Sequence, residues 1–442
     1  MERATIVAVI DREIAPAAAA WAEVPMDVDV RRVRAHFAGK IFVSVRHVLM
    51  NEADYVDFQT DDLIPHVLDA IPPHKRVISW YGRATDLTQL ASFVTPLLQH
   101  RAALYRVVVD AQNYREALLP LQLLKSLGRR DVIAWADGPI GTWTRLLAPQ
   151  FGAPFVFSAN VPQLVADYGF PQIVKLREIF GIAGNPVSGS LSPRLHNAAF
   201  REIARPALYV PFHVPEFEDF WTAAIASGAL DALGLPISAI CVVSPHKEDA
   251  IASASKHTPM VRRAHSTNFF VREDNVWTAD TTDPGSVIVA LHERGVDIAG
   301  HPMAVVGCGG SGRAIAAALQ QAGAHVTLVN RSRERGSFAG GLLGLPCVPL
   351  AGFSAERYSV VVNATPVGRD GQGVPFATER MRDDAVVVDL AYGAQPTPLI
   401  SRIRARGRMA IDGRDILMRQ AMRQFHIMTG QEMPQSVLEV VT

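Results

Sequence analysis

The sequence predicts an α/β protein with more than one domain. Its 442 residues exceed what one ordinary hydrophobic core accommodates. Short β-like runs alternate with amphipathic helix patterns over the first 177 residues, which is typical of a parallel sheet. Residues 305–319 combine an apolar run, closely spaced glycines and an alanine-rich helix pattern. That order of strand, turn and helix is typical of a dinucleotide-binding unit.

Composition narrows the class of protein. Hydrophobic residues make up 49% of the chain, charged residues 19%, and the formal net charge is zero. This balance gives no bulk electrostatic reason to bind nucleic acid or an anionic membrane. We see no apolar run that could span a bilayer and no signal peptide, so we expect a cytoplasmic protein. The three cysteines, Cys241, Cys308 and Cys347, form neither a metal-ligand spacing nor a disulfide framework, and no metal is expected.

The first 177 residues contain about eight strand candidates, which suggest a closed barrel. They are residues 6–10, 23–30, 41–46, 55–58, 76–81, 105–109, 131–135 and 155–157. Amphipathic helices are expected over residues 87–99 and 114–127. The early inter-strand segments are short, so the first helices should be trimmed or missing.

The glycine-rich turn carries the strongest cofactor signal. Its glycines let the backbone turn tightly and approach a pyrophosphate, which the helix N-terminus attracts. The next strand, residues 324–330, ends without an acid to hold a ribose 2′-hydroxyl, and two arginines there suit a 2′-phosphate instead. We therefore expect NADP(H) rather than NAD; a plain turn with a solvated basic end is the weaker alternative. The predicted cofactor residues are Gly307, Gly309, Gly310, Ser311, Gly312, Asn330, Arg331 and Ser332.

The N-terminal part resembles type I 3-dehydroquinate dehydratase, a (β/α) barrel, most clearly at residues 141–145, 150–154 and 170–172. Arg46 stands where that family has a substrate-binding arginine. The resemblance places Arg106 at the Schiff-base lysine and Tyr81 at the general-base histidine. A guanidinium stays protonated and cannot form a Schiff base. Pro25 stands where the family has an arginine in the second strand. Because proline cannot donate a backbone hydrogen bond, it makes a central position of this strand in the sheet less expected. These substitutions leave two interpretations of the barrel: its binding pocket is altered, or it has lost its chemistry and serves only as a scaffold.

From residue 178 onward the chain resembles shikimate dehydrogenase. Ser190 and Ser192 match the Ser-x-Ser that binds the substrate carboxylate in that family. Lys247 matches the lysine of its Pro-x-Lys, and Asp283 the acid paired with that lysine. The resemblance therefore implies proton transfer by Lys247 and Asp283, and contact between Asn268 and substrate hydroxyls.

The same resemblance continues to the C-terminus. Thr365 matches a residue beside the nicotinamide, and Tyr392 one that faces the substrate, although a core aromatic is a fair rival for Tyr392. Gln420 and Gln424 lie four residues apart and share a helix face, where a substrate contact competes with simple solvation. Three positions depart from the family pattern: Gly189, Val243 and Thr281.

Together these features predict three domains. They are a dehydratase-like barrel over residues 1–177, a substrate domain over 178–285 completed by 412–442, and a Rossmann NADP domain over 286–411. The expected activity is NADP-dependent reduction of 3-dehydroshikimate to shikimate, with a barrel that has lost its Schiff-base lysine. A bifunctional dehydratase–dehydrogenase and a non-catalytic metabolite sensor are the alternatives. The sequence does not decide whether shikimate or quinate is the preferred substrate, and it does not predict the oligomeric state.

Overall fold

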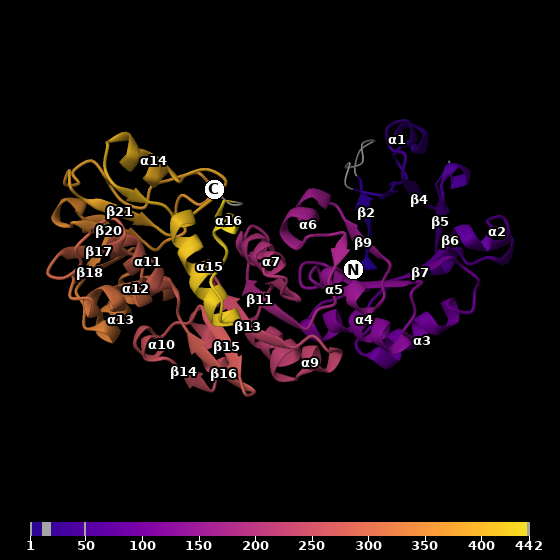
Figure 1. The fold of residues 1–442 in the computed structure, drawn as a ribbon, viewed down its shortest axis with the longest axis horizontal. Helices are drawn as coiled ribbons and strands as arrows, with labels where there is room; N and C mark the ends of the chain where they lie inside the picture. The colour runs from indigo at the N-terminus through magenta and orange to yellow at the C-terminus, as the bar shows by residue number, and fades with distance from the viewer. Residues whose placement is uncertain (1, 11–18, 48–49, 440–442) are drawn as a thin grey trace. The chain divides into compact units, whose positions relative to one another are not determined.

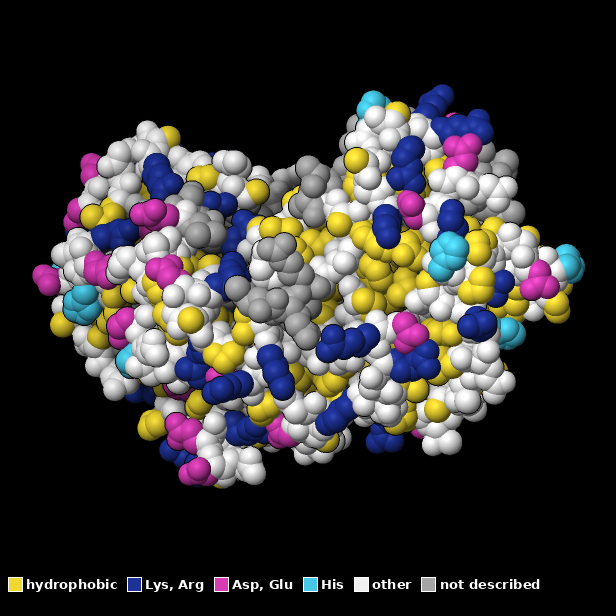
Figure 2. Space-filling model, turned by 45° about the vertical axis from the view of Figure 1, so that its right-hand side comes forward, with side chains coloured by type: hydrophobic (Ala, Val, Ile, Leu, Met, Phe, Trp, Pro, Cys, Tyr) yellow, Lys and Arg dark blue, Asp and Glu magenta, His cyan; other side chains and the backbone are white. Residues whose placement is uncertain are grey.

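The computed structural model describes residues 2–10, 19–47 and 50–439. The chain divides into two compact units, Met1–Ile237 and Ser238–Thr442. Positive and negative side chains are interspersed over the face shown in Figure 2. Among the described helices, none is long and apolar enough to cross a membrane. The three predicted domain boundaries stay predictions.

Eight parallel strands form the sheet of the first unit, as predicted (Figure 1). They run in the order β8-β7-β6-β5-β4-β3-β2-β9, so chain neighbours lie side by side. Their bounds are β2 (Thr5–Val9), β3 (Trp21–Glu23), β4 (Lys40–Ser44), β5 (Tyr55–Gln59), β6 (Arg76–Gly82), β7 (Leu104–Asp110), β8 (Val132–Asp137) and β9 (Phe155–Ser158). Between β8 and β9 the described residues form no ladder; instead Trp135 stacks on Phe157 with ring centroids 5.2 Å apart. The barrel is thus nearly closed.

The second predicted strand was wrong in extent. β3 ends at Glu23, and α1 (Val30–His36) begins where the prediction continued the strand. A turn in which the backbone N–H of Val28 donates to the carbonyl of Pro25 at 3.2 Å interrupts the expected strand, and Asp29 then caps α1 by accepting the backbone N–H of Arg31. Pro25 lies beyond β3, so the strand keeps a central place between β2 and β4 despite the proline.

The helices of the barrel follow the prediction. The early ones are short: α1 and α2 (Pro65–Asp69). The later ones, α3 (Leu87–Leu97) and α4 (Tyr114–Leu127), are amphipathic. Asp86 and Asn113 cap them by accepting the backbone N–H three residues on.

The rest of the first unit packs beside the barrel. Besides the antiparallel pair β1 (Glu2–Arg3) and β10 (Gln172–Ile173), its strands and α-helices are α5 (Thr144–Leu147), α6 (Val161–Tyr168), β11 (Glu178–Gly184), α7 (Ser192–Glu202), β12 (Ala207–His213), α8 (Phe217–Phe220) and α9 (Ala229–Leu233). β11 and β12 pair in parallel. The hydroxyl of Tyr114 on α4 donates to the carbonyl of His213 at 2.7 Å, and the ring of Trp143 lies 5.2 Å from that of Phe212. The barrel and residues 178–237 therefore share a core.

The second unit contains two sheets. In the first, β13 (Ile237–Val242), β15 (Phe269–Glu273) and β16 (Val276–Asp280) are antiparallel, and β14 (Lys256–His257) is parallel to β16. The second is fully parallel, with the order β19-β18-β17-β20-β21-β22. Its strands are β17 (Pro302–Val306), β18 (His325–Asn330), β19 (Cys347–Pro349), β20 (Val360–Asn363), β21 (Val386–Asp389) and β22 (Ala410–Ile411). This order is that of a Rossmann domain, as predicted.

Helices of the second unit bury apolar faces against these strands. They are α10 (Pro259–Ala264), α11 (Asp283–His292), α12 (Gly310–Gln321), α13 (Arg333–Leu343), α14 (Pro398–Ala405) and α15 (Gly413–Thr429); the short α16 (Gln435–Leu438) follows them in the chain. The carboxyl ends of the parallel strands meet at one edge of their sheet, where ligands bind in open α/β folds.

His196 on α7 makes the first unit sensitive to acid. Its side chain is fully buried and stacks on Tyr209 with ring centroids 4.4 Å apart. Burial lowers the pKa of His196 to about 3. The unfolded chain takes up a proton there below about pH 6.5, whereas the folded chain does so only near pH 3. The effect of His196 on the free energy of unfolding is therefore absent above pH 6.5. As the pH falls from 6.5 toward 3, this residue lowers the free energy of unfolding progressively.

We expect His196→Phe to shift acid unfolding to lower pH, because it removes this proton uptake. Relative to wild type, the variant should gain up to about 1.4 kcal/mol for each pH unit below 6.5. Circular dichroism across an acid titration measures this, with the exposed His66→Phe as control. Equal acid midpoints for wild type and His196→Phe would contradict the assignment.

Candidate active site

Asp283 is the centre of the polar cluster in the second unit. It is the first residue of α11 and only 2% exposed, and the helix N-terminus favours its negative charge. Its Oδ2 accepts a hydrogen bond from Lys247 Nζ at 2.6 Å. Its Oδ1 accepts from Asn268 Nδ2 at 2.5 Å and from Gln420 Nε2 at 2.6 Å. The predicted pairing of Lys247 with Asp283 is present in the structure.

Lys247 joins this carboxylate to the glycine-rich loop. It lies in the turn after β13, with its side chain 17% exposed. Its Nζ donates to Asp283 and also to Ser311 Oγ, at 2.8 Å. An ammonium held by an acid but still open to solvent can pass a proton to a bound molecule.

Buried amides fix the start of α11. Asn268 Oδ1 accepts from the backbone N–H of Thr282 at 2.8 Å, and its Nδ2 donates to Thr282 Oγ1 at 3.1 Å. Gln424 Nε2 donates to the same hydroxyl at 2.9 Å. Gln420 and Gln424 therefore share one face of α15, turned toward α11, and Gln424 is 6% exposed. Simple solvation does not describe this pair.

The glycine loop after β17 has the geometry of a phosphate cradle. Gly307 has φ +104°, which favours glycine, and a Cβ on Gly312 would overlap the carbonyl oxygen of Gly307. A Cβ on Gly310 would lie 3.0 Å from Lys247 Cβ and would overlap the hydroxyl of Ser266. Gly309 instead faces open space at the N-terminus of α12. The loop thus fits a dinucleotide pyrophosphate.

The predicted 2′-phosphate residues lie at the end of β18 and in the turn that follows it. Asn330 Oδ1 accepts from the backbone N–H of Cys308 at 3.1 Å, which ties this strand end to the glycine loop. Arg331 is exposed, and Ser332 caps α13 by accepting the backbone N–H of Arg335. Arg335 was not predicted from the sequence; its exposed guanidinium in the first turn of α13 pairs with Glu248 at 2.9 Å. Its place four residues after Arg331 was the available signal.

Arg313, on α12, is a second residue for which the sequence predicted no role. It is 1% exposed in a helix whose other buried residues are glycine, alanine, isoleucine and leucine, and this burial is visible only in the structure. Its guanidinium donates to the carbonyls of Ala264 and His265 at 2.8 Å and of Cys308 at 3.2 Å. Arg313 therefore holds the glycine loop against the end of α10.

Thr365 and Tyr392 follow neighbouring strands, β20 and β21. Thr365 Oγ1 donates to Asn363 Oδ1 at 2.7 Å, and Asn363 Nδ2 donates to Asp389 Oδ1 at 2.8 Å. Burial raises the pKa of Asp389, and a hydrogen bond from Thr397 opposes the shift. Tyr392 is half-buried, three residues beyond β21. The two loops are thus tied together at the carboxyl edge of the sheet.

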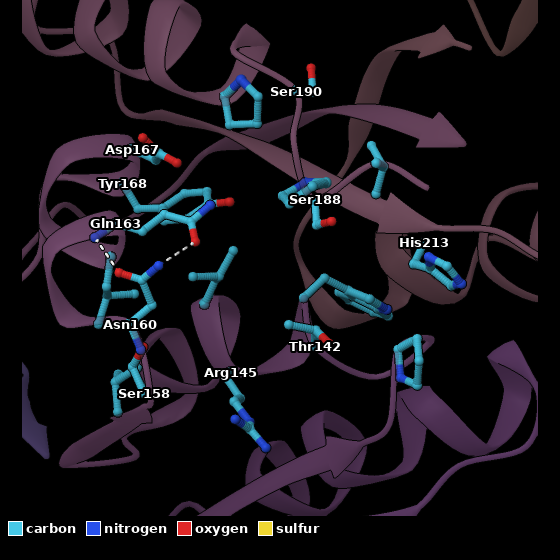
Figure 3. A pocket seen from close by; sticks show the side chains of 18 of the residues that line it. Thr142, Arg145, Ser158, Asn160, Gln163, Asp167, Tyr168, Ser188, Ser190 and His213 are labelled. Carbon is cyan, nitrogen blue, oxygen red and sulfur yellow. Dashed lines mark hydrogen bonds between the residues drawn. The ribbon is translucent and has the colours of Figure 1, made fainter. Parts of the chain in front are cut away.

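Ser190 and Ser192 lie in the first unit, on the loop after β11 and at the start of α7. The backbone N–H of Ser192 donates to Ser190 Oγ at 3.2 Å. Ser190 lines a cavity of about 420 Å³, to which Ser188, Asn160 and Gln163 also contribute (Figure 3). The carboxyl ends of β8, β9 and β11 all lead into this cavity, whose other walls are largely apolar.

The barrel interior holds a buried ion cluster around Arg106 on β7. Its guanidinium donates to Glu23 and Asp57 at 2.5 Å each and to Ser79 Oγ at 3.1 Å. It also lies 5.5 Å from the ring of Tyr81. Burial alone would lower the pKa of Arg106, but the carboxylates of Asp57 and Glu23 outweigh it and raise that pKa.

No lysine of residues 1–177 reaches this cluster in the part of the chain that the structure describes. The sequence has four there, Lys40, Lys75, Lys125 and Lys175. Lys40 and Lys75 stand at the start of β4 and just before β6, at the amino edge of the barrel. Lys125 on α4 donates to the carbonyl of Ala232, and Lys175 is exposed beyond the barrel strands.

Arg46 is exposed and pairs with Asp62 at 2.8 Å.

Comparison with known families adds independent information. The family described as "Shikimate dehydrogenase substrate binding domain" matches residues 182–270. The family described as "Type I 3-dehydroquinase" matches residues 36–186.

Similar curated proteins cover the C-terminal part of the chain. The NADP(+) shikimate dehydrogenase of Acidiphilium cryptum is 35% identical over 245 residues, which are 55% of this chain and 87% of the relative. The enzyme of Halobacterium salinarum is 35% identical over 260 residues, 58% of this chain and 95% of the relative.

Solved structures agree with these relatives. Shikimate 5-dehydrogenase of Thermus thermophilus, in complex with NADP(H) and shikimate, is 28% identical with a TM-score of 0.53, and covers 60% of this chain and 98% of that one. Shikimate dehydrogenase of Aquifex aeolicus is 28% identical with a TM-score of 0.54, over 59% of this chain and 96% of that one.

Two glycine substitutions in the loop should separate stability from cofactor affinity. Gly312→Ala places a methyl group against the carbonyl of Gly307, so we expect the free energy of unfolding to fall by about 1–3 kcal/mol. The same variant should also bind NADPH more weakly. Gly309→Ala meets only open space in the free protein, so it should keep the thermal midpoint and still weaken NADPH binding. Calorimetry and NADPH fluorescence titration measure both effects. A Gly309→Ala variant that binds NADPH as wild type does would place the cofactor elsewhere.

Proposed function

The chain belongs to the shikimate dehydrogenase family, and we propose that it interconverts 3-dehydroshikimate and shikimate with NADP(H). The hydrogen-bonded pair of Lys247 and Asp283 beside the glycine loop is the observation that carries the proposal. An acid–base pair at the edge where a dinucleotide binds is what ketone reduction requires.

The residues of the second unit fit NADP(H). Gly307, Gly310 and Gly312 leave no room for side chains, and Gly309 leaves the helix N-terminus open toward a pyrophosphate. Arg331 and Arg335 offer guanidiniums for a 2′-phosphate, next to Asn330 and Ser332. Thr365 borders the loop on the nicotinamide side. When bound, NADPH supplies the hydride.

Lys247 would supply the proton. As a hydride reaches the ketone carbon, Nζ donates a proton to the carbonyl oxygen, the C=O double bond becomes a C–O single bond, and an alcohol results. Asp283 keeps Nζ within 2.6 Å of its carboxylate and so fixes the direction of transfer. Solvent then returns the proton to Lys247. In the reverse direction the neutral amine accepts the proton of the alcohol.

The substrate contacts rest on the resemblance to the family. In this proposal Ser190 and Ser192 hold the carboxylate, while Asn268, Gln420 and Tyr392 meet the hydroxyl groups. Gln424 and Thr282 would not contact the substrate. Their hydrogen bonds hold Asn268 and the start of α11 in place.

The barrel would carry out no Schiff-base chemistry. Arg106 occupies the interior position with its charge already satisfied by Glu23 and Asp57. The lysines described in this part of the chain lie away from that cluster. The bifunctional alternative gains support from the match of residues 36–186 to type I 3-dehydroquinase, and so requires its own test.

The dehydrogenase is tested by following NADP+ reduction in the presence of shikimate. Lys247→Ala should lower kcat by at least about a hundredfold, since a positioned acid–base group contributes this much. Quinate serves as second substrate. Lys256→Ala, at an exposed lysine nearby in sequence, is the matched control. Folded wild-type protein that turns over neither acid would favour the sensor hypothesis.

Dehydration by the barrel is tested on the full chain. We expect no conjugated enone to appear when 3-dehydroquinate is added without NADP(H), and no covalent adduct after borohydride treatment, because none of the described lysines of this part faces Arg106. Product formation that disappears in Arg106→Ala would instead establish a second activity.

A further inference from the structure

Ser311 stands where the glycine loop meets the proton-transfer pair. It is the second residue of α12, directly after Gly310, whose Cβ position lies 3.0 Å from Lys247 Cβ. The missing side chain at Gly310 lets the turn that carries Lys247 approach the helix. The Ser311 hydroxyl is thereby brought within 2.8 Å of Lys247 Nζ.

We propose that Ser311 is a positioning residue that orients Lys247 for proton transfer and links its position to the cofactor loop; this rests on the proposed function. An ammonium has three N–H groups. Asp283 Oδ2 takes one at 2.6 Å and Ser311 Oγ takes the second at 2.8 Å. With two directions fixed, the third is fixed as well and remains for the reacting oxygen.

The burial of the two partners supports this role. Asp283 is 2% exposed and is itself held by Asn268 and Gln420, so it is a rigid acceptor. Lys247 keeps 17% of its side chain exposed, which leaves it one open side. A long, flexible side chain gains most from a second fixed partner, since its rotamer freedom is otherwise large.

Ser311 connects this orientation to the cofactor. Its backbone belongs to the first turn of α12, whose free N–H groups would face the pyrophosphate. A ligand that settles on this turn fixes Ser311, and Ser311 fixes Lys247 Nζ. Binding at the loop and the position of the lysine are therefore coupled, and the coupling acts equally in both directions.

The test compares Ser311→Ala with Ser311→Thr, which keeps the hydroxyl, and with Ser266→Ala, which removes a different hydroxyl packed against the same loop. We expect Ser311→Ala to lower kcat for shikimate oxidation about tenfold, the loss of one hydrogen bond to a charged group. The dissociation constant for NADPH should change by less than about threefold, because the backbone N–H groups of the turn remain. Ser311→Thr should regain most of kcat, and Ser266→Ala should resemble wild type.

Equal losses in Ser311→Ala and Ser266→Ala would overturn the proposal, because a general disturbance of the loop explains them. A fall in NADPH affinity that matches the fall in kcat would also overturn it, since Ser311 would then be only a cofactor ligand. Ser311→Thr as slow as Ser311→Ala would exclude the hydroxyl as the operative group.

A second readout does not depend on turnover. The rate at which acetic anhydride modifies Lys247 is measured by mass spectrometry, relative to the exposed Lys256. Ser311→Ala should raise this ratio several-fold, and NADP+ should protect Lys247 more in wild type than in the variant. Suppose that wild type and Ser311→Ala differ in these two ways, but wild type does not oxidise shikimate. The proposed function then fails, whereas the link between Ser311 and Lys247 stands. Unchanged ratios would refute the link.

Discussion

The buried carboxylate of Asp283 holds the second unit's polar cluster together. It stands at the start of α11, where the helix dipole stabilises its charge. Three donors from separate segments converge on it: Lys247, Asn268 and Gln420. Because a buried carboxylate without donors is costly, each of these segments is drawn to a defined position. The turn after β13, the start of β15, α11 and α15 are organised by one side chain.

Local patterns predicted much of the fold. Seven of the eight barrel strands, α4 to the residue, and the turn from β17 into α12 follow from apolar periodicity and glycine spacing. The strand expected over residues 23–30 coincides with β3 only at Glu23, because the turn between Pro25 and Val28 and the helix cap at Asp29 lie inside the window, and the apolar pattern reveals neither. The seam between β8 and β9, where the described residues form no ladder, was also not predicted: these strands are neighbours in sequence, whereas β2 and β9, which are far apart in sequence, do pair.

The candidate site was predicted by resemblance more than by spacing. Lys247 and Asp283 are 36 residues apart, and no periodicity brings them together, yet the fold places them in hydrogen-bond contact. Arg313 was passed over because an arginine in a helix is normally solvated; only its burial shows that it holds backbone carbonyls. In the barrel, the sequence alone predicts that Arg106 cannot form a Schiff base. It does not predict the two carboxylate partners of Arg106, because they lie on other strands. A single ammonium would match those partners less well than a planar guanidinium does.

The donors that α15 contributes have a consequence for how the protein is made. The chain emerges from the ribosome N-terminus first, so the glycine loop and Asp283 are synthesised well before Gln420, which lies 137 residues beyond Asp283. A nascent chain can complete the parallel strands β17 to β21 while Asp283 still lacks one of its donors and Thr282 lacks Gln424. The polar cluster around Asp283 therefore reaches its final geometry only after α15 has docked, and α15 also adds Ile416 to the core beside the parallel sheet.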